Sequence, residues 1–361
     1  MKTSFKIVIL LALLVPSFVQ ADEIPLFYEG IRPLGMGGAF TAVADDGNAI
    51  FYNPAGLNQI KGFGRFDIIN LTVELNKNAL DLIKDAKEIS DISDPNENSD
   101  KAIDLINKNI GERFHLKAAL FPHIVFHNFG FGILAQGVLN GAIHNPLASN
   151  TLEVRGTADL AVMTAGAYRF KVKGRPLILG LTAKAINRNK LDKETYTTRE
   201  IIDGEFKIQK ELNPENGFAL DVGALYPIPI FLNPTVGLSL QNIVGGDLGD
   251  AGKLPPQVNL GVALRPEIGF GKVVIAADWV DVAQQVGTDK DIAKRLHAGV
   301  EYQFPVILTL RAGLAQGYPS FGTTFSLWLV RFSYAYYISE IGAFAGQQPD
   351  PRHVVQLSVG F

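Results

Sequence analysis

The stretch RHVVQLSVGF, Arg352 to Phe361, alternates apolar with other side chains. Every second residue from Val355 to Phe361 is apolar, and a β-strand places such residues on one face. The residues between them are polar or small, so the two faces of this strand differ in character. The pattern is typical of a strand that separates an apolar environment from a polar one.

The same alternation recurs upstream, in RLHAGVEYQF (295–304), QVNLGVALRP (257–266) and KVVIAADWV (272–280). Turn-forming residues separate about 14 such runs along the chain, and bacterial membrane barrels use an even number of strands. Polar residues on the faces opposite the apolar ones are candidates for the barrel lumen: Arg265, Asp278, Arg295, His297, Glu301, Arg311 and Arg331.

The composition supports a membrane-embedded barrel. The chain has 361 residues, of which 47% are hydrophobic and only 19% are charged, and it has no cysteine. Beyond the N-terminus no run of ~18 apolar residues could form a spanning helix. The remaining classes are a soluble β-rich protein and an outer-membrane barrel, and the alternating strands favour the barrel. We therefore predict an all-β fold, a transmembrane antiparallel barrel over residues 63–361, in contact with outer-membrane lipids. A formal net charge of −3 gives no indication of a nucleic-acid partner.

The first residues have the pattern of a cleaved signal peptide. Lys2 and Lys6 precede the apolar run IVILLALLVP, and the small residue Ala21 offers a cleavage site. This predicts export of a chain whose signal peptide is residues 1–21, to the outer membrane of a Gram-negative-type bacterium. The C-terminal strand also indicates the outer membrane, because an alternating strand that ends on the aromatic Phe361 resembles the sorting signal that barrel assembly machinery recognises. That machinery is an expected partner.

The segment RPLGMGGAFTAVADDGNAIFYNPAGL, Arg32 to Leu57, closely resembles the N-terminal signature of the FadL-type outer-membrane transporter superfamily. Within that group it is nearer to the PorV- and TraF-like branch. The resemblance implies that residues 22–62 fold back inside the barrel as a plug. A dinucleotide-binding loop is the competing interpretation of GMGGAF, but no strand precedes it. The matching residues implied to build or gate the plug are Gly35, Gly37, Gly38, Asp45, Asp46, Asn53, Pro54 and Gly56.

Physical chemistry is compatible with a plug. Glycine lets backbones approach closely, and an Asn-Pro pair favours a turn. Asp45 and Asp46 would be costly against lipid and need partners in the lumen. We expect their partners among the arginines of the barrel strands, namely Arg265, Arg295, Arg311 and Arg331.

Residues 78–112 break the strand pattern. Apolar residues recur there at a helical period in two halves, which DPNENS separates, and charges of both signs cover the other faces. The sequence predicts an amphipathic helical insertion. It is either a solvated hairpin or a docking element for a protein partner.

No motif for catalysis, a cofactor or a metal stands out. The six histidines lack metal-ligand spacing, and no G-x-S-x-G nucleophile turn is present. We therefore expect a non-enzymatic protein without cofactor or metal. The first hypothesis is passive uptake of small, hydrophobic, fatty-acid-like compounds, released through a kink or side opening of a plugged barrel. The alternative is an outer-membrane component of a secretion, conjugation or surface-attachment system.

Overall fold

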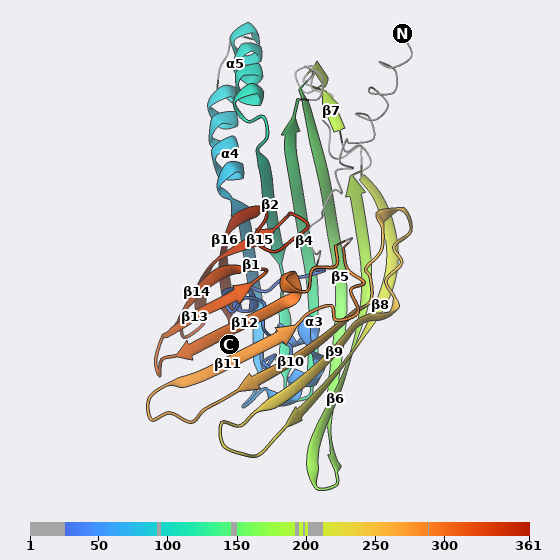
Figure 1. Ribbon diagram of the computed structural model, residues 1–361, viewed down its shortest axis with the longest axis vertical. Coiled ribbons are helices and arrows are strands. Elements are labelled where there is room, and N and C mark those ends of the chain that lie inside the picture. The colour runs from blue at the N-terminus through green and yellow to red at the C-terminus, as the bar shows by residue number, and fades with distance from the viewer. Residues whose placement is uncertain are drawn as a thin grey trace, which may run out of the picture.

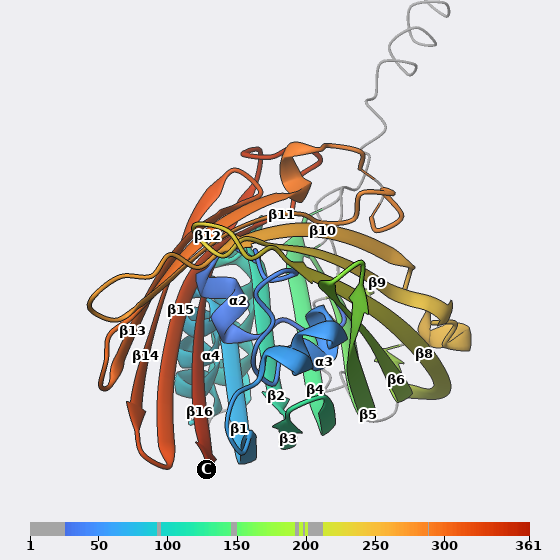
Figure 2. The same cartoon turned by 90° about the horizontal axis from the view of Figure 1, so that it is seen from below.

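The computed structural model describes residues 26–91, 95–145, 150–191, 195–197, 199–200, 212–287 and 289–361. The predicted signal peptide lies outside the described residues. The strands form one antiparallel sheet that closes on itself, because β1 pairs with β16 on one side and with β2 on the other (Figure 1). Seen along the barrel, the strands form a ring (Figure 2).

The strands are β1 (Arg65–Asn76), β2 (Arg113–Leu120), β3 (His123–Phe126), β4 (Phe129–His144), β5 (Thr151–Val172), β6 (Arg175–Leu191), β7 (Thr195–Thr197), β8 (Leu212–Pro227), β9 (Thr235–Gly245), β10 (Gln257–Leu264), β11 (Lys272–Trp279), β12 (Leu296–Gln303), β13 (Leu308–Ala315), β14 (Tyr318–Leu327), β15 (Val330–Glu340) and β16 (Pro349–Gly360). The helices are α2 (Ile31–Gly35), α3 (Ala49–Tyr52), α4 (Lys77–Ser90) and α5 (Pro95–Lys108), with 3-10 turns η1 (Pro54–Gln59), η4 (Gly249–Ala251) and η5 (Ala293–Arg295). No helix of the described residues has both the length and the apolar character that a membrane span requires.

The barrel has 14 strand positions. β2 and β3 occupy one position, since both pair with β1 and β4, and β7 only extends the sheet beside the start of β5. The predicted fold class, a closed antiparallel barrel of about 14 strands, is confirmed.

Alternate residues of the strands face lipid and lumen. In β16, Val355 and Leu357 are each 40% exposed on the outside, whereas Gln356 and Ser358 are buried inside. An outward apolar surface of this kind belongs to a barrel of the outer-membrane type. Tyr337, near the end of β15, is buried. It points inward, and its hydroxyl donates to Glu74 Oε1.

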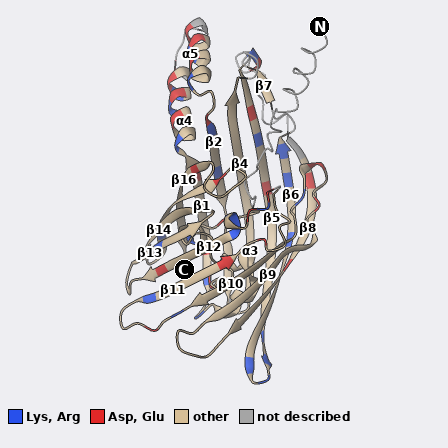
Figure 3. Ribbon diagram, in the orientation of Figure 1, with Lys and Arg blue, Asp and Glu red and all other residues tan. Residues whose placement is uncertain are grey.

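The two rims differ in the length of their connections. Phe361 lies beside Phe66 at the rim with the shorter turns, such as residues 127–128 and 173–174. The other rim has the longer loops, including residues 280–295 and 341–348, and there α4 and α5 extend beyond β1 and β2 (Figure 1). Figure 3 shows charges of both signs on these two helices. In outer-membrane barrels the longer loops face the cell exterior, so the helices lie on the outer side.

Candidate functional site

The N-terminal segment, residues 26–62, lies inside the ring of strands, as α2 and α3 show (Figure 2). Its backbone contacts the wall where strands carry glycine. A Cβ atom on Gly313 would lie 2.2 Å from Gly37 N, and one on Gly180 would lie 2.3 Å from Ala55 N. Gly37 itself has φ +64°, which favours glycine. Small residues on both surfaces therefore allow the segment to lie directly against the barrel.

Polar groups of the wall bind the backbone of the segment. Asp278 Oδ2 on β11 accepts hydrogen bonds of 2.7 Å from the amides of Phe40 and Thr41. His297 Nδ1 on β12 donates to Gly37 O at 2.5 Å. Arg265, just beyond β10, donates to two carbonyls of residues 42 and 43. Three predicted lumen residues therefore bind the backbone of the segment directly.

Arg32 is the partner of Asp45 and Asp46, and it comes from the segment itself. Its Nη1 lies 2.6 Å from Asp45 Oδ1 and 2.9 Å from Asp46 Oδ2. Its Nε and Nη2 make a bidentate pair with Glu301 on β12, at 2.8 and 2.7 Å. Arg311 Nε also binds Glu301, at 2.6 Å.

The expected pairing of the two aspartates with barrel arginines is wrong, because Arg32 on α2 lies closer. Burial raises the pKa of Asp46, but the Arg32 guanidinium and hydrogen bonds from Arg32 and Asn48 hold it below its ordinary value. Arg331 pairs instead with Asp67 on β1, at 2.7 Å.

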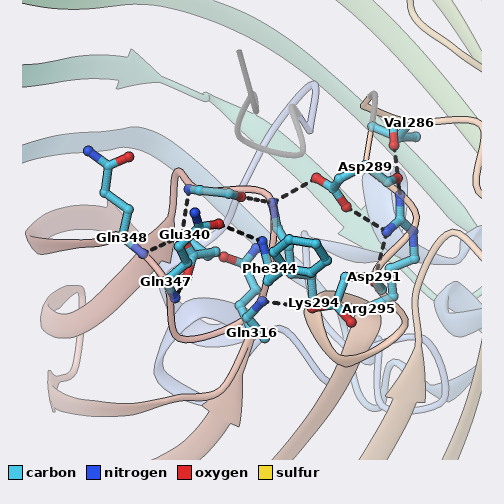
Figure 4. Close-up of polar contacts among 12 residues, drawn as sticks. Val286, Asp289, Asp291, Lys294, Arg295, Gln316, Glu340, Phe344, Gln347 and Gln348 are labelled. Atoms are coloured by element: carbon cyan, nitrogen blue, oxygen red, sulfur yellow. Dashed lines mark hydrogen bonds and ion pairs between the residues drawn. The ribbon is translucent and has the colours of Figure 1, made fainter. Parts of the chain in front are cut away.

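Arg295 is not a lumen residue of a strand, contrary to the prediction. It is the last residue of η5, one position before β12, and it is fully buried in the loop between β11 and β12 (Figure 4). Its guanidinium binds Asp281, Asp289 and three loop carbonyls. Lys294 beside it binds Asp289 and the carbonyl of Gly342 in the loop after β15. Arg295 therefore stabilises its own loop, and Lys294 connects that loop to the loop after β15.

The Asn-Pro turn anchors the end of the segment. Asn53 Nδ2 donates to Thr41 O at 2.8 Å and reaches Ala224 O and Leu238 O of the wall at 3.3 Å, while its Oδ1 accepts from Ala55 N. Pro54 begins η1. Among the predicted glycines, Gly35 lies beside Gly322 of β14, Gly38 beside His297, and Gly56 against Ala44 O of the segment.

A cavity lies between the segment and the outer half of the wall. It has an empty volume of ≈ 1090 Å³, which includes space open to solvent. Aromatic rings of the segment line it: Tyr28 and Phe51 stack at 4.1 Å between centroids, and Phe27 lies 6.4 Å from Phe51. Apolar walls with a few polar groups are typical of small-molecule sites.

The lumen on the other side of the segment is polar. A wider space there, with an empty volume of ≈ 2840 Å³, is lined by Arg32, Asp46, Glu301, Arg311 and other charged residues. It opens among the shorter turns, because residues 227–229 and 265–268 also line it. We call it the inner vestibule. The segment thus separates an aromatic cavity from a charged vestibule.

The regular strand pattern of the wall is interrupted next to the aromatic cavity, although Phe121 N still donates to Asn70 O and Pro122 O still accepts from Ile133 N. β2 ends at Leu120 and β3 begins at His123, so Phe121 and Pro122 lie between two strand segments. The ring of Phe121 points inward and lies 4.9 Å from Phe51 and 5.5 Å from Tyr28. β1 has a register shift opposite this point, between Asp67 and Ile69. Pro122 has no amide hydrogen to donate to the sheet.

Of the residues that line this cavity, the sequence identified Gly37, Gly38 and His297. It missed the aromatic ones, such as Tyr28 and Phe51, and the neighbouring Phe121. One signal was present: Pro122 lies within an apolar strand pattern, where proline marks an edge or an interruption. The predicted candidates lie mainly around the segment and the inner vestibule instead. Among the described residues, no cluster of histidine, aspartate and glutamate has the arrangement of a metal site.

No protein-family model and no curated protein sequence matches the chain. Solved structures do match. The toluene transporter TodX of P. putida superposes with a TM-score of 0.54 at 13% identity, over 93% of this chain and 99% of that chain. The chain shares the fold of TodX. A mutant of TodX, a monoaromatic hydrocarbon channel, gives a TM-score of 0.54 at 14% identity over 92% of this chain and 99% of that chain. The fold implied by the resemblance to FadL-type transporters is therefore confirmed, while the PorV- and TraF-like branch stays a prediction.

Proposed function

We propose that the protein is a passive, non-enzymatic channel for the uptake of small hydrophobic compounds across the outer membrane. The main observation behind this proposal is that the two sides of the N-terminal segment differ. The aromatic cavity lies on its outer side, and the charged inner vestibule lies on its inner side. An apolar compound gains by burial among Phe27, Tyr28 and Phe51, and it would lose that gain in the inner vestibule. Residues 22–62 act as the plug, held by Arg32, Asp278 and His297.

A route through the wall suits such a ligand better than a route through the vestibule. The rings of the cavity lead to Phe121, which lies between β2 and β3, and the outer surface there carries the exposed side chains of Ile68 and Ile69. A compound that leaves beside Phe121 enters the apolar layer of the membrane without crossing the inner vestibule. TodX and its mutant, which share this fold, are described as a toluene transporter and a monoaromatic hydrocarbon channel.

Replacing Pro122 by valine is expected to slow uptake about fivefold. The substitution adds a backbone donor at the interruption, and one net hydrogen bond of about 1 kcal/mol makes opening about fivefold rarer. The measurement is uptake of labelled toluene and of a labelled fatty acid by a deletion strain that carries each variant. Pro214→Val, at a strand proline of β8 that lines neither the cavity nor the vestibule, is the control and keeps wild-type uptake. Normal uptake by Pro122→Val would contradict exit at this point.

Deleting residues 78–112 is expected to leave uptake unchanged. No described residue of this hairpin lines the cavity, and its apolar side chains pack at the outer ends of β1, β2, β4 and β5. Leu80 and Ile83 are 39% and 48% exposed on α4, which is the observation that favours the alternative role in assembly or secretion. Uptake of labelled toluene, together with the amount of each surface protein, distinguishes the two functions. Reduced uptake would show that the hairpin belongs to the transport route, and loss of a surface protein would support a partner at the hairpin.

A further inference from the structure

The cavity has two chemically different sides, and this difference bears on which hydrophobic compounds it takes. Phe27, Tyr28 and Phe51 form an aromatic side that belongs to the N-terminal segment. The barrel contributes polar side chains from several strands, among them Lys184 of β6 and Ser320 of β14. A pure hydrocarbon would leave these polar groups without a ligand partner.

The positive charge in the cavity is already neutralised. Lys184 is the one lysine or arginine among the described residues that line the cavity, and it is 4% exposed. Its ammonium group lies 2.8 Å from Asp221 Oδ1 and 2.7 Å from Asn242 Oδ1. Glu29 adds a carboxylate to the same lining. A carboxylate ligand would have to compete with Asp221 for Lys184 and would meet like charge, so the cavity disfavours anions.

The hydroxyl of Ser320 is a neutral hydrogen-bonding group without a partner. Ser320 is 2% exposed, and its Oγ has no hydrogen-bond partner although it lines the cavity. Buried hydroxyls nearly always have a partner, and such an exception calls for an explanation. The Oγ atom itself has almost no accessible surface, so a rotation about χ1 would bring it to a hydroxyl or carbonyl oxygen on the ligand. That oxygen would supply the missing partner, because serine both donates and accepts.

We propose that the cavity selects uncharged aromatic compounds that carry one hydrogen-bonding oxygen, such as alkylphenols, over the matching carboxylates. This inference rests on the proposed function and specifies its substrate class. The aromatic side receives the ring, and Ser320 receives the oxygen. Because Lys184 is paired with Asp221, it does not attract an anionic ligand.

The test compares three compounds that differ in one substituent: p-cresol, toluene and p-toluate. Binding to the detergent-solubilised full-length protein is measured by isothermal titration calorimetry, and uptake by cells is measured in parallel. We expect p-cresol to bind about fivefold more tightly than toluene, which corresponds to one added hydrogen bond, and p-toluate to bind most weakly.

Ser320→Ala is the decisive variant. It should reduce p-cresol affinity about fivefold and leave toluene affinity unchanged. Ser239→Ala is the matched control, since Ser239 Oγ is also buried without a partner, on β9, but does not line the cavity. The control should bind all three compounds as the wild type does.

The outcomes separate this inference from the function on which it rests. Equal affinity for p-cresol and toluene, unchanged in Ser320→Ala, would overturn the substrate class while uptake of both compounds still supports the channel. Tightest binding of p-toluate would also overturn it. Failure of all three compounds to bind or to enter cells would instead contradict the proposed function.

Discussion

Gly313→Val is expected to displace the N-terminal segment and open the barrel. A Cβ at this position of β13 would lie 2.2 Å from Gly37 N, 2.3 Å from Met36 C and 2.7 Å from Gly37 Cα. These atoms are backbone atoms of the segment, so no side-chain rotation relieves the contact. Overpacking that neighbouring side chains can relieve by small shifts costs about 1–3 kcal/mol. Here a β-branched side chain on a strand would overlap backbone atoms, so we expect a larger cost, which the segment avoids by moving away.

The expected consequence is continuity between the aromatic cavity and the inner vestibule. Single-channel recording in planar bilayers should show large, persistent conductance for Gly313→Val where the wild-type protein stays closed. Cells that carry the variant should also become sensitive to large hydrophilic antibiotics. The strands themselves keep their pairing, since the altered side chain points at the segment and not at a neighbouring strand.

Gly137→Val is the matched control. Gly137 lies within β4, and a Cβ there would have no heavy atom within 4 Å. Both variants place valine in a strand, so they share its effect on strand propensity and differ in the contact with the segment. A Gly313→Val protein that remains closed, with wild-type uptake, would show that the segment does not close the barrel through this contact.

The barrel could be predicted because apolar and polar residues alternate regularly along its strands. Each strand that alternates, such as Arg352–Phe361, must place one face toward lipid, and closure removes the exposed edges. The rule fails at strand ends, where Arg295 has the parity of a lumen residue but precedes the first residue of β12. Its partners Asp281 and Asp289 come from an irregular loop, and no periodic sequence pattern identifies them.

The candidate site was predictable only in part, because its contacts depend on how the chain folds back. Asp45 and Asp46 were expected to need a cationic partner, and they have one. The sequence did not identify Arg32, because that pairing needs α2 and the Asp45–Asp46 turn to lie together inside the ring. The aromatic cavity brings Tyr28 and Phe51 next to Phe121, and such proximity between distant residues leaves no local pattern.

Arg32→Ala is expected to release the segment by a different physical route. Arg32 bridges Asp45 and Asp46 of the segment and Glu301 of β12, and its side chain is 17% exposed. Removing one partner of a fully buried ion pair costs about 3–5 kcal/mol. Asp45 and Asp46 are 29% and 22% exposed, so the expected cost here is below that range. Arg311 still binds Glu301, so most of the uncompensated charge lies on the two aspartates, within the segment.

Hydrogen exchange of the amides between residues 35 and 46 measures this effect. Protection should fall strongly in Arg32→Ala, while the amides of the barrel strands exchange as in the wild type. Arg32→Lys should restore only part of the protection, since one ammonium group cannot reproduce both a bidentate pair with Glu301 and the contacts with Asp45 and Asp46. Arg175→Ala, at an exposed arginine whose Nη1 lies 3.4 Å from the Tyr226 hydroxyl, should leave protection unchanged. Full protection in Arg32→Ala would mean that Asp278, His297 and the glycine contacts hold the segment without the ion pairs, and the segment would then open only through steric changes such as Gly313→Val.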